Sequence, residues 1–169
     1  MKIVIVGCGR VGSTVARQMA ADGHDVTVID SLESAFDRLG QDFPGTMVVG
    51  SGVDQDVLER AGIDRADCFL SVTNGDNRNI MAAQIAREIF HVGKVMTRIY
   101  DPIRERVYRE LGLYTYCPTL VGAGIARTYF DEGAGAADAA RGAVTGAAPE
   151  PLGAPLPPVA VGAEGRGDG

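Results

Sequence analysis

The sequence predicts an α/β protein with a doubly wound sheet of six parallel strands and helices on both faces. Short apolar segments rich in Val and Ile alternate with amphipathic segments of helical period. The first apolar segment, Lys2–Val6, runs directly into a glycine-rich turn at residues 7–12 that opens a helix. The second ends at an acid, Asp30, eighteen residues after Gly12. A strand, a glycine turn, a helix and an acid in this order are typical of a Rossmann fold.

Six segments have the length and the β-branched or aromatic content of strands. They are Lys2–Val6, Asp25–Asp30, Thr46–Gly50, Cys68–Val72, Lys94–Tyr100 and Tyr114–Cys117. Right-handed crossovers between two βαβ halves then predict the strand order 3-2-1-4-5-6. This order places a crevice at the carboxyl ends of the first and fourth strands.

Six helices are predicted between and after these strands. They are Val11–Asp22, Leu32–Leu39, Gln55–Ala61, Asn77–Phe90, Pro102–Leu111 and Leu120–Tyr129. Pro102 at a helix start and Gly112 just past a helix end support these bounds. In the fourth helix Met81, Ile85 and Ile89 recur at i, i+4 and i+8, so we expect this stripe to face the sheet.

The chain changes character near residue 132. Residues 1–131 are predicted to form the Rossmann domain, whereas residues 132–169 are dominated by Ala, Gly and Pro and contain no aromatic residue. Such a segment buries too little apolar surface to offset its ordering entropy, so a disordered tail is predicted. A helix around Ala136–Ala148, formed on a partner, is the alternative.

Composition narrows the class of protein. The net charge of −6 and the pI near 4.9 disfavour a nucleic-acid or anionic-membrane surface. No apolar run approaches the roughly 20 residues that cross a bilayer, and Met1 leads directly into the first strand rather than a signal peptide. Three scattered cysteines without a CxxC pair favour free thiols in a reducing cytosol over disulfides or a metal site.

The glycine turn carries the main functional prediction, a phosphate-binding loop. Gly7 permits the tight turn, Gly9 lets the backbone approach a pyrophosphate, and Gly12 allows close packing of helix on strand. The helix N-terminus adds unpaired N–H groups and the positive end of its dipole. The predicted loop residues are Gly7, Cys8, Gly9, Arg10, Val11 and Gly12.

Asp30 is predicted to bind the ribose. At the carboxyl end of its strand it can accept two hydrogen bonds from the sugar diol. A 2′-phosphate would meet this carboxylate, and Ser31, Leu32 and Glu33 supply no cation to offset it, so NADP is disfavoured. NAD(H) and ATP/ADP both remain possible, because either ribose suits Asp30.

Other loops at the same edge supply further candidates. Asp54 is either a contact for the adenine amino group or the N-cap of the next helix. Thr73 and Asn74 are assigned to a phosphate or ribose, with a plain turn and cap as the alternative. Arg98 lies within a buried strand and is expected to meet a phosphate or site carboxylate; an ion pair with a nearby Glu or Asp is the alternative.

No catalytic residue is predicted. His24 and His91 fall in turns at the amino edge of the sheet, away from the crevice, and the chain has no Tyr-xxx-Lys pair. We therefore expect a ligand-binding protein rather than an enzyme. The alternatives are a small NAD-dependent oxidoreductase subunit whose substrate site comes from another chain, and a scaffold that binds no nucleotide.

Several ordered motifs together resemble the N-terminal Rossmann domain of Trk-type potassium-uptake regulators, also called the RCK N-terminal domain. The matching segments are residues 1–12, Asp30, residues 50–54, 58–63, 66–67 and 71–74, Asn77, Asn79, residues 98–102 and residues 111–112. The resemblance covers roughly residues 1–130. The third-strand loop departs from it, since Gly50-Ser51-Gly52-Val53-Asp54 stands where relatives often have Gly-Asp-Ala-Thr-Asp.

The resemblance implies a cytoplasmic subunit, peripheral at the inner face of the plasma membrane, that gates a potassium transporter. Its ligand would be NAD(H) or ATP/ADP, bound by residues 7–11, Asp30, Thr73, Asn74 and Arg98. It also implies a dimer or larger ring, with Leu120–Tyr129 as the assembling helix. Many relatives carry a C-terminal regulatory domain where this chain has its tail, which leaves open a paired regulatory subunit.

Overall fold

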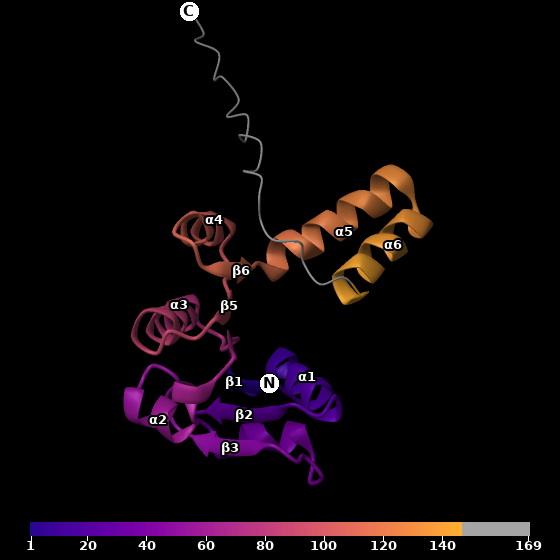
Figure 1. The fold of residues 1–169 in the computed structure, drawn as a ribbon. Helices are drawn as coiled ribbons and strands as arrows, with labels where there is room; N and C mark the ends of the chain where they lie inside the picture. Colours follow the sequence, from indigo (N-terminus) through magenta and orange to yellow (C-terminus); the bar gives the residue numbers. More distant parts are fainter. Residues whose placement is uncertain (147–169) are drawn as a thin grey trace, which may run out of the picture. The chain divides into compact units, whose positions relative to one another are not determined.

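The computed structural model, which describes residues 1–146, is built on a six-stranded, all-parallel sheet. Its order is β3-β2-β1-β4-β5-β6, so the predicted Rossmann topology is confirmed. The strands are β1 (Lys2–Val6), β2 (Asp25–Asp30), β3 (Thr46–Val49), β4 (Cys68–Ser71), β5 (Lys94–Arg98) and β6 (Tyr114–Tyr116), as Figure 1 shows.

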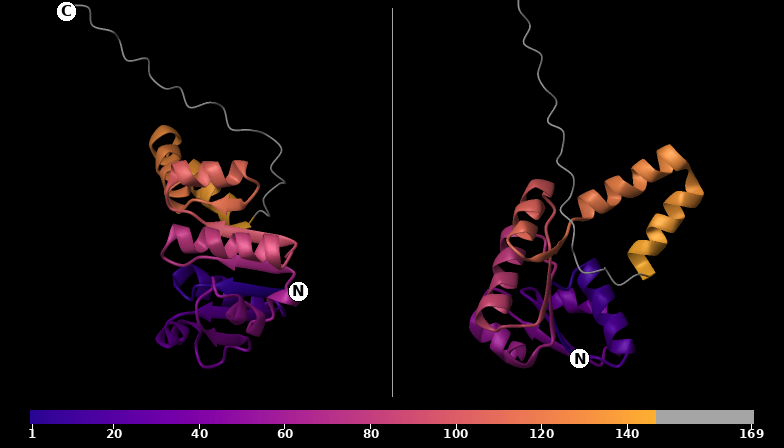
Figure 2. Two further views of the ribbon diagram at one scale, coloured as in Figure 1. Left: turned by 90° about the vertical axis from the view of Figure 1, so that its left-hand side faces the viewer. Right: turned by 45° about the horizontal axis from the view of Figure 1, so that its top comes forward.

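Helical segments connect the strands and cover both faces of the sheet (Figure 2). They are α1 (Arg10–Ala21), η1 (Glu33–Leu39), α2 (Gln55–Arg60), η2 (Ile63–Arg65), α3 (Asp76–Gln84), η3 (Ile85–Ile89) and α4 (Pro102–Glu110). The second predicted helix, η1, is a 3₁₀-helix, and the fourth ends in a π-helical turn, η3. Two further helices, α5 (Pro118–Glu132) and α6 (Ala134–Gly146), follow β6.

The core consists of one apolar cluster on each face of the sheet. Val4 and Val6 of β1 pack with α2, α3 and the start of the π-helical turn. Ile3 and Ile5, the alternate residues of the same strand, pack with α1 and η1. This division follows from the period of two along a strand and explains why β1 is apolar throughout.

The stripe predicted for the fourth helix is wrong at two of its three positions. Met81 is 55% exposed and Ile89 is 48% exposed, whereas Ile85 packs partly against the core. The buried face instead carries small residues, including Ala83 and Ala86. Ile80 is buried with these alanines, which let the helix approach the sheet closely, and Met81 and Ile89 are left on the outer side.

The described residues divide into two units, Met1–Gly124 and a second that begins at Ile125. Residues 134–146, assigned above to the tail, form α6. The rest of the predicted tail, residues 147–169, lies outside the described residues, and the predicted domain boundary at residue 131 stays a prediction. Among residues 1–146, every helix is too short or too polar to span a bilayer.

Candidate nucleotide-binding site

A cavity of about 800 Å³ opens at the carboxyl ends of the strands. Loops that follow β1, β2, β3, β4 and β5 all contribute to its walls. Nine of the eleven predicted site residues line it: Gly7, Cys8, Gly9, Arg10, Val11, Asp30, Thr73, Asn74 and Arg98. The topology therefore brings together residues from four separate parts of the sequence.

The two remaining predicted residues lie beside the cavity rather than in its walls. Gly12 packs against the turn, since an added Cβ would strike the carbonyl oxygen of Gly7. This contact fits the helix-packing role that the glycine spacing predicts. Asp54 caps α2, and its Oδ1 accepts the Asp56 N–H at 3.0 Å.

The glycine loop leaves its backbone accessible from the cavity. Gly7 has φ of +105°, and an added Cβ would lie 2.9 Å from the Thr73 nitrogen, so a side chain is strained here. At Gly9, the N-cap of α1, an added Cβ would meet nothing within 4 Å, and no side chain caps the helix. The free amides of the α1 N-terminus are thus suited to an anion.

Asp30 joins the first two loops of the site. Its Oδ2 accepts the Cys8 N–H at 2.7 Å, and its Oδ1 accepts the Leu32 N–H at 3.0 Å. Each carboxylate oxygen keeps a further lone pair. The carboxylate therefore lines the cavity in a fixed orientation with capacity to accept hydroxyl groups.

The Cys8 thiol is fully buried behind the loop. Burial, with the nearby Asp30 carboxylate as a second cause, raises the pKa of this thiol to about 11 from an ordinary 9.0. The thiol stays protonated at neutral pH, so Cys8 contributes its backbone rather than a thiolate to the site.

A buried asparagine that was not predicted as a site residue organises the loop after β4. The Asn79 Oδ1 accepts the Thr73 N–H and the Thr73 hydroxyl, each at 2.7 Å. Its Nδ2 donates to the carbonyls of Thr73 and Arg98, each at 3.0 Å. Asn79 thereby ties the loop after β4 to the end of β5. The predicted apolar stripe of this helix gave no signal for Asn79, because the helix buries a different face.

Arg98 is a buried cation at the wall of the cavity, 8% exposed. Its Nη2 donates to the carbonyls of Val72 at 2.9 Å and Thr73 at 2.6 Å, and its guanidinium lies 4.5 Å from the Tyr100 ring centroid. Within residues 1–146 no carboxylate pairs with it, and Nε has no partner. The positive charge is therefore available to an anion in the cavity.

Two further arginines line the cavity and were not predicted. Arg38 comes from η1, eight residues after Asp30, so a cation does enter this cavity from the segment after β2. Arg78 comes from α3 and donates to the Asn74 Oδ1. The cavity is thus lined by four arginines and one carboxylate in a chain whose net charge is −6. His24 and His91 do not line it.

The fold is that of a Rossmann domain, and its cavity is lined by the start of α1, four arginines and one carboxylate. Residues 3–117 match the TrkA-N domain family, and the chain belongs to that family, as the resemblance predicts. It is 53% identical over 115 residues to the Trk system potassium uptake protein TrkA of Streptomyces coelicolor. That alignment covers 68% of this chain and 52% of the relative, so the chain spans about half the length of the relative it matches.

Solved structures share the fold. The Shewanella denitrificans Kef C-terminal domain in its AMP-bound form has a TM-score of 0.67 at 23% identity, covering 86% of this chain and 91% of its own. The RCK domain of GsuK has a TM-score of 0.64 at 25% identity, covering 76% and 27%. GsuK has also been solved bound to ADP and to NAD.

Proposed function

We propose that this chain is a nucleotide-sensing regulatory subunit of a potassium transport system. It binds NAD(H) or ATP/ADP and gates a membrane potassium transporter from the cytoplasmic face. The family membership and the name of the Streptomyces relative support the potassium role and favour a regulator over the oxidoreductase alternative. The proposal includes a homo-oligomer or a paired regulatory subunit as the working form.

The observation that carries the nucleotide assignment is the buried Arg98 in the same cavity as an uncapped helix N-terminus. Arg98 has no carboxylate partner among the described residues, and the start of α1 lines the same cavity. A diphosphate between them would satisfy both groups. Asp30, at the adjoining wall, would hold the ribose hydroxyls.

A nucleotide can gate a transporter only if it binds two conformations of the regulator with different affinities. The loop after β5 is suited to differ between two such conformations, because it links the cavity to α4. Asp76 at the start of α3 accepts the backbone N–H groups of Tyr100 and Asp101, and Asp101 caps α4. A ligand that moves Tyr100 in the cavity wall would therefore move the start of α4.

Titration calorimetry with NADH, NAD, ATP and ADP tests the nucleotide assignment. We expect at least one of the four to bind with a Kd below about 1 mM. Arg98→Gln should weaken that binding about ten- to hundredfold, because it removes a charge-assisted contact. Arg17→Gln removes the same charge from the exposed side of α1, outside the cavity, and should leave the affinity unchanged. Failure of all four nucleotides would refute the assignment.

A further inference from the structure

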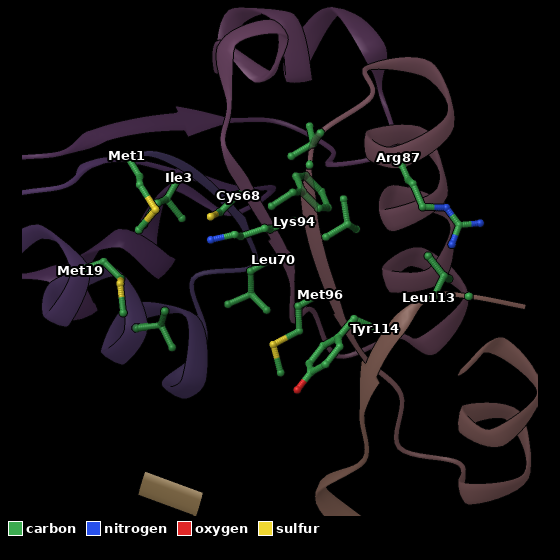
Figure 3. Close-up of a pocket in the computed structure, with 16 residues that line it drawn as sticks. Met1, Ile3, Met19, Cys68, Leu70, Arg87, Lys94, Met96, Leu113 and Tyr114 are labelled. Atoms are coloured by element: carbon green, nitrogen blue, oxygen red, sulfur yellow. The ribbon is translucent and has the colours of Figure 1, made fainter. Parts of the chain in front are cut away.

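The strands β5 and β6 carry two cross-strand pairs of side chains on one face of the sheet. Met96 pairs with Tyr114, and Arg98 pairs with Tyr116 two residues further along. Figure 3 shows Met96 and Tyr114 next to each other, where they line an apolar groove of about 490 Å³. Because side chains alternate along a strand, Arg98 and Tyr116 point to the same face. Tyr116 therefore projects beside Arg98 at the edge where the nucleotide cavity opens.

The hydroxyl group of Tyr116 is buried beside the Arg98 guanidinium without a hydrogen bond. Within residues 1–146, three buried side-chain polar atoms lack a partner, and two of them are Tyr116 Oη and Arg98 Nε. Burial raises the pKa of Tyr116 above its ordinary 10.0, and the positive charge of Arg98 beside the hydroxyl opposes this rise. Nearly all buried polar atoms in folded proteins have a partner, so two neighbouring exceptions indicate a contact that is made in another state.

The other contacts of Arg98 leave one edge of its guanidinium free. Nη2 donates to the carbonyls of Val72 and Thr73, and the ring of Tyr100 lies against the guanidinium, 4.5 Å from its carbon. These contacts hold one nitrogen and one face of the group, but they do not hold Nε. A partner on Nε would fix the orientation in which the guanidinium meets an anion in the cavity.

A tyrosine suits this position because its hydroxyl accepts a hydrogen bond without carrying a charge. A carboxylate beside Arg98 would pair with the guanidinium and compete with a phosphate for it. The hydroxyl of Tyr116 stays protonated at neutral pH, because its pKa lies above 10.0, and so leaves the positive charge to the ligand. The ring packs partly against the apolar cluster beneath α1 and η1, which holds the hydroxyl in place.

We infer that Tyr116 is a positioning residue whose hydroxyl accepts the Arg98 Nε–H in the nucleotide-bound protein and fixes the guanidinium toward the phosphates. The inference rests on the proposed function, since it concerns the same cavity. Tyr116 does not line that cavity, so it acts through Arg98 rather than on the ligand. The new hydrogen bond gives a partner to both of the unpaired atoms.

Calorimetry with the nucleotide that binds the wild-type chain most tightly tests this role. Tyr116→Phe removes one oxygen and keeps the ring, so it should weaken binding about three- to tenfold. The thermal midpoint of unfolding should not fall, because the hydroxyl has no hydrogen bond in the free protein. Tyr114→Phe is the matched control. It makes the same change on the same strand and face, outside the nucleotide cavity, and should leave the affinity unchanged.

A double-mutant cycle separates positioning of Arg98 from a general effect on the domain. If Tyr116 acts through Arg98, Tyr116→Phe should weaken binding no further in a chain that already carries Arg98→Gln. The same fold-loss of affinity in both backgrounds would show that the two residues act independently, which would overturn the inference. Unchanged affinity of Tyr116→Phe, or an equal loss in Tyr114→Phe, would overturn it as well.

Absorbance titration of the tyrosines tests the contact without any ligand. The chain has five tyrosines, and the titration that is missing in Tyr116→Phe belongs to Tyr116. Arg98→Gln removes the positive charge beside the hydroxyl, so the pKa of Tyr116 should rise further. Circular dichroism over the same pH range checks that the protein stays folded. An unchanged titration in Arg98→Gln would contradict the contact on which the inference depends.

These results distinguish the inference from the proposed function. A wild-type chain that binds none of the four nucleotides would refute the proposed function and this role of Tyr116 with it. A wild-type chain that binds a nucleotide, and a Tyr116→Phe variant that binds it equally well, would refute the inference alone.

Discussion

Asp30 holds the loops of the site in place and is also proposed to bind the ligand. Two backbone amides, of Cys8 and Leu32, already donate to its carboxylate. These bonds hold the phosphate loop against the start of the next segment. A ribose would use the remaining lone pairs, so structure and recognition depend on one side chain.

Asp30→Ala should weaken nucleotide binding by about 1.5–3 kcal/mol without unfolding the domain. Calorimetry with the nucleotide that binds wild type best, together with a thermal melt, measures both effects. Asp42→Ala removes an exposed acid outside the cavity and serves as the control. Unchanged affinity in Asp30→Ala would mean that the ribose lies elsewhere.

The cysteines provide a second prediction at this scale. Because its pKa is raised to about 11, Cys8 should resist alkylation at pH 8, whereas the partly exposed Cys68 should react first. Mass spectrometry of a timed iodoacetamide reaction measures the order. Labelling of Cys8 before Cys68 in folded protein would contradict the buried environment.

The Cys8 thiol also makes the free energy of unfolding depend on pH in the alkaline range. The folded pKa of Cys8 lies above its ordinary value of 9.0, so the folded state holds this proton more tightly than the unfolded state. Its contribution to stability is complete below pH 9 and is lost as the pH rises toward 11. Urea unfolding of wild type and Cys8→Ala across this range should show a steeper loss in wild type.

At the scale of elements, the strands and the glycine turn were predictable because their signals are local. A short apolar run, a glycine pattern and an acid at a strand end depend on neighbours in sequence. The buried face of α3 and η3 was not predictable in this way. It is set by how closely Ala83 of α3 and Ala86 of η3 approach the sheet, which is a tertiary property.

The candidate site also contains residues that local sequence signals predict and residues that depend on tertiary packing. Asp30 was identified from its position at a strand end, and it lines the cavity. Asn79 and Arg38 were missed, because each enters the site from a helical segment whose rotation the sequence pattern did not fix. For Arg98, an ion pair with a nearby acid was the alternative to a ligand contact. The described residues do not form this ion pair.

The packing of α3 can be tested by placing one side chain at two positions. Ala83→Leu should destabilise the protein by about 1–3 kcal/mol, because it overpacks a fully buried site. Met81→Leu, on the exposed side of the same helix, should change stability by less than about 0.5 kcal/mol. Urea unfolding measures the free energy of unfolding of both variants. An equal loss of stability in the two would contradict the observed helix orientation.

At the scale of the whole molecule, the proposed regulator needs the nucleotide cavity, the assembly and a transporter to be coupled. The chain spans about half the length of its Streptomyces relative. The nucleotide cavity belongs to the unit Met1–Gly124. A bound nucleotide would therefore act on the sheet of this unit.

Potassium flux tests the coupling. With a Trk-type membrane subunit reconstituted in vesicles, adding this chain should make flux depend on the nucleotide that binds it. Asp30→Ala should shift that dependence to higher nucleotide concentration by the factor seen in calorimetry, because the coupling is limited by occupancy. A potassium flux that stays the same with and without each nucleotide that binds would refute the gating role.

The central claim is that the α1 amides and Arg98 hold a diphosphate while Asp30 holds the adjoining ribose. A crystal structure of the protein with bound ADP or NADH tests it most directly. We predict phosphate oxygens within hydrogen-bond distance of the amides at residues 9–11 and of the Arg98 guanidinium, with ribose hydroxyls on Asp30. A nucleotide lodged elsewhere, with this cavity empty, would contradict the account.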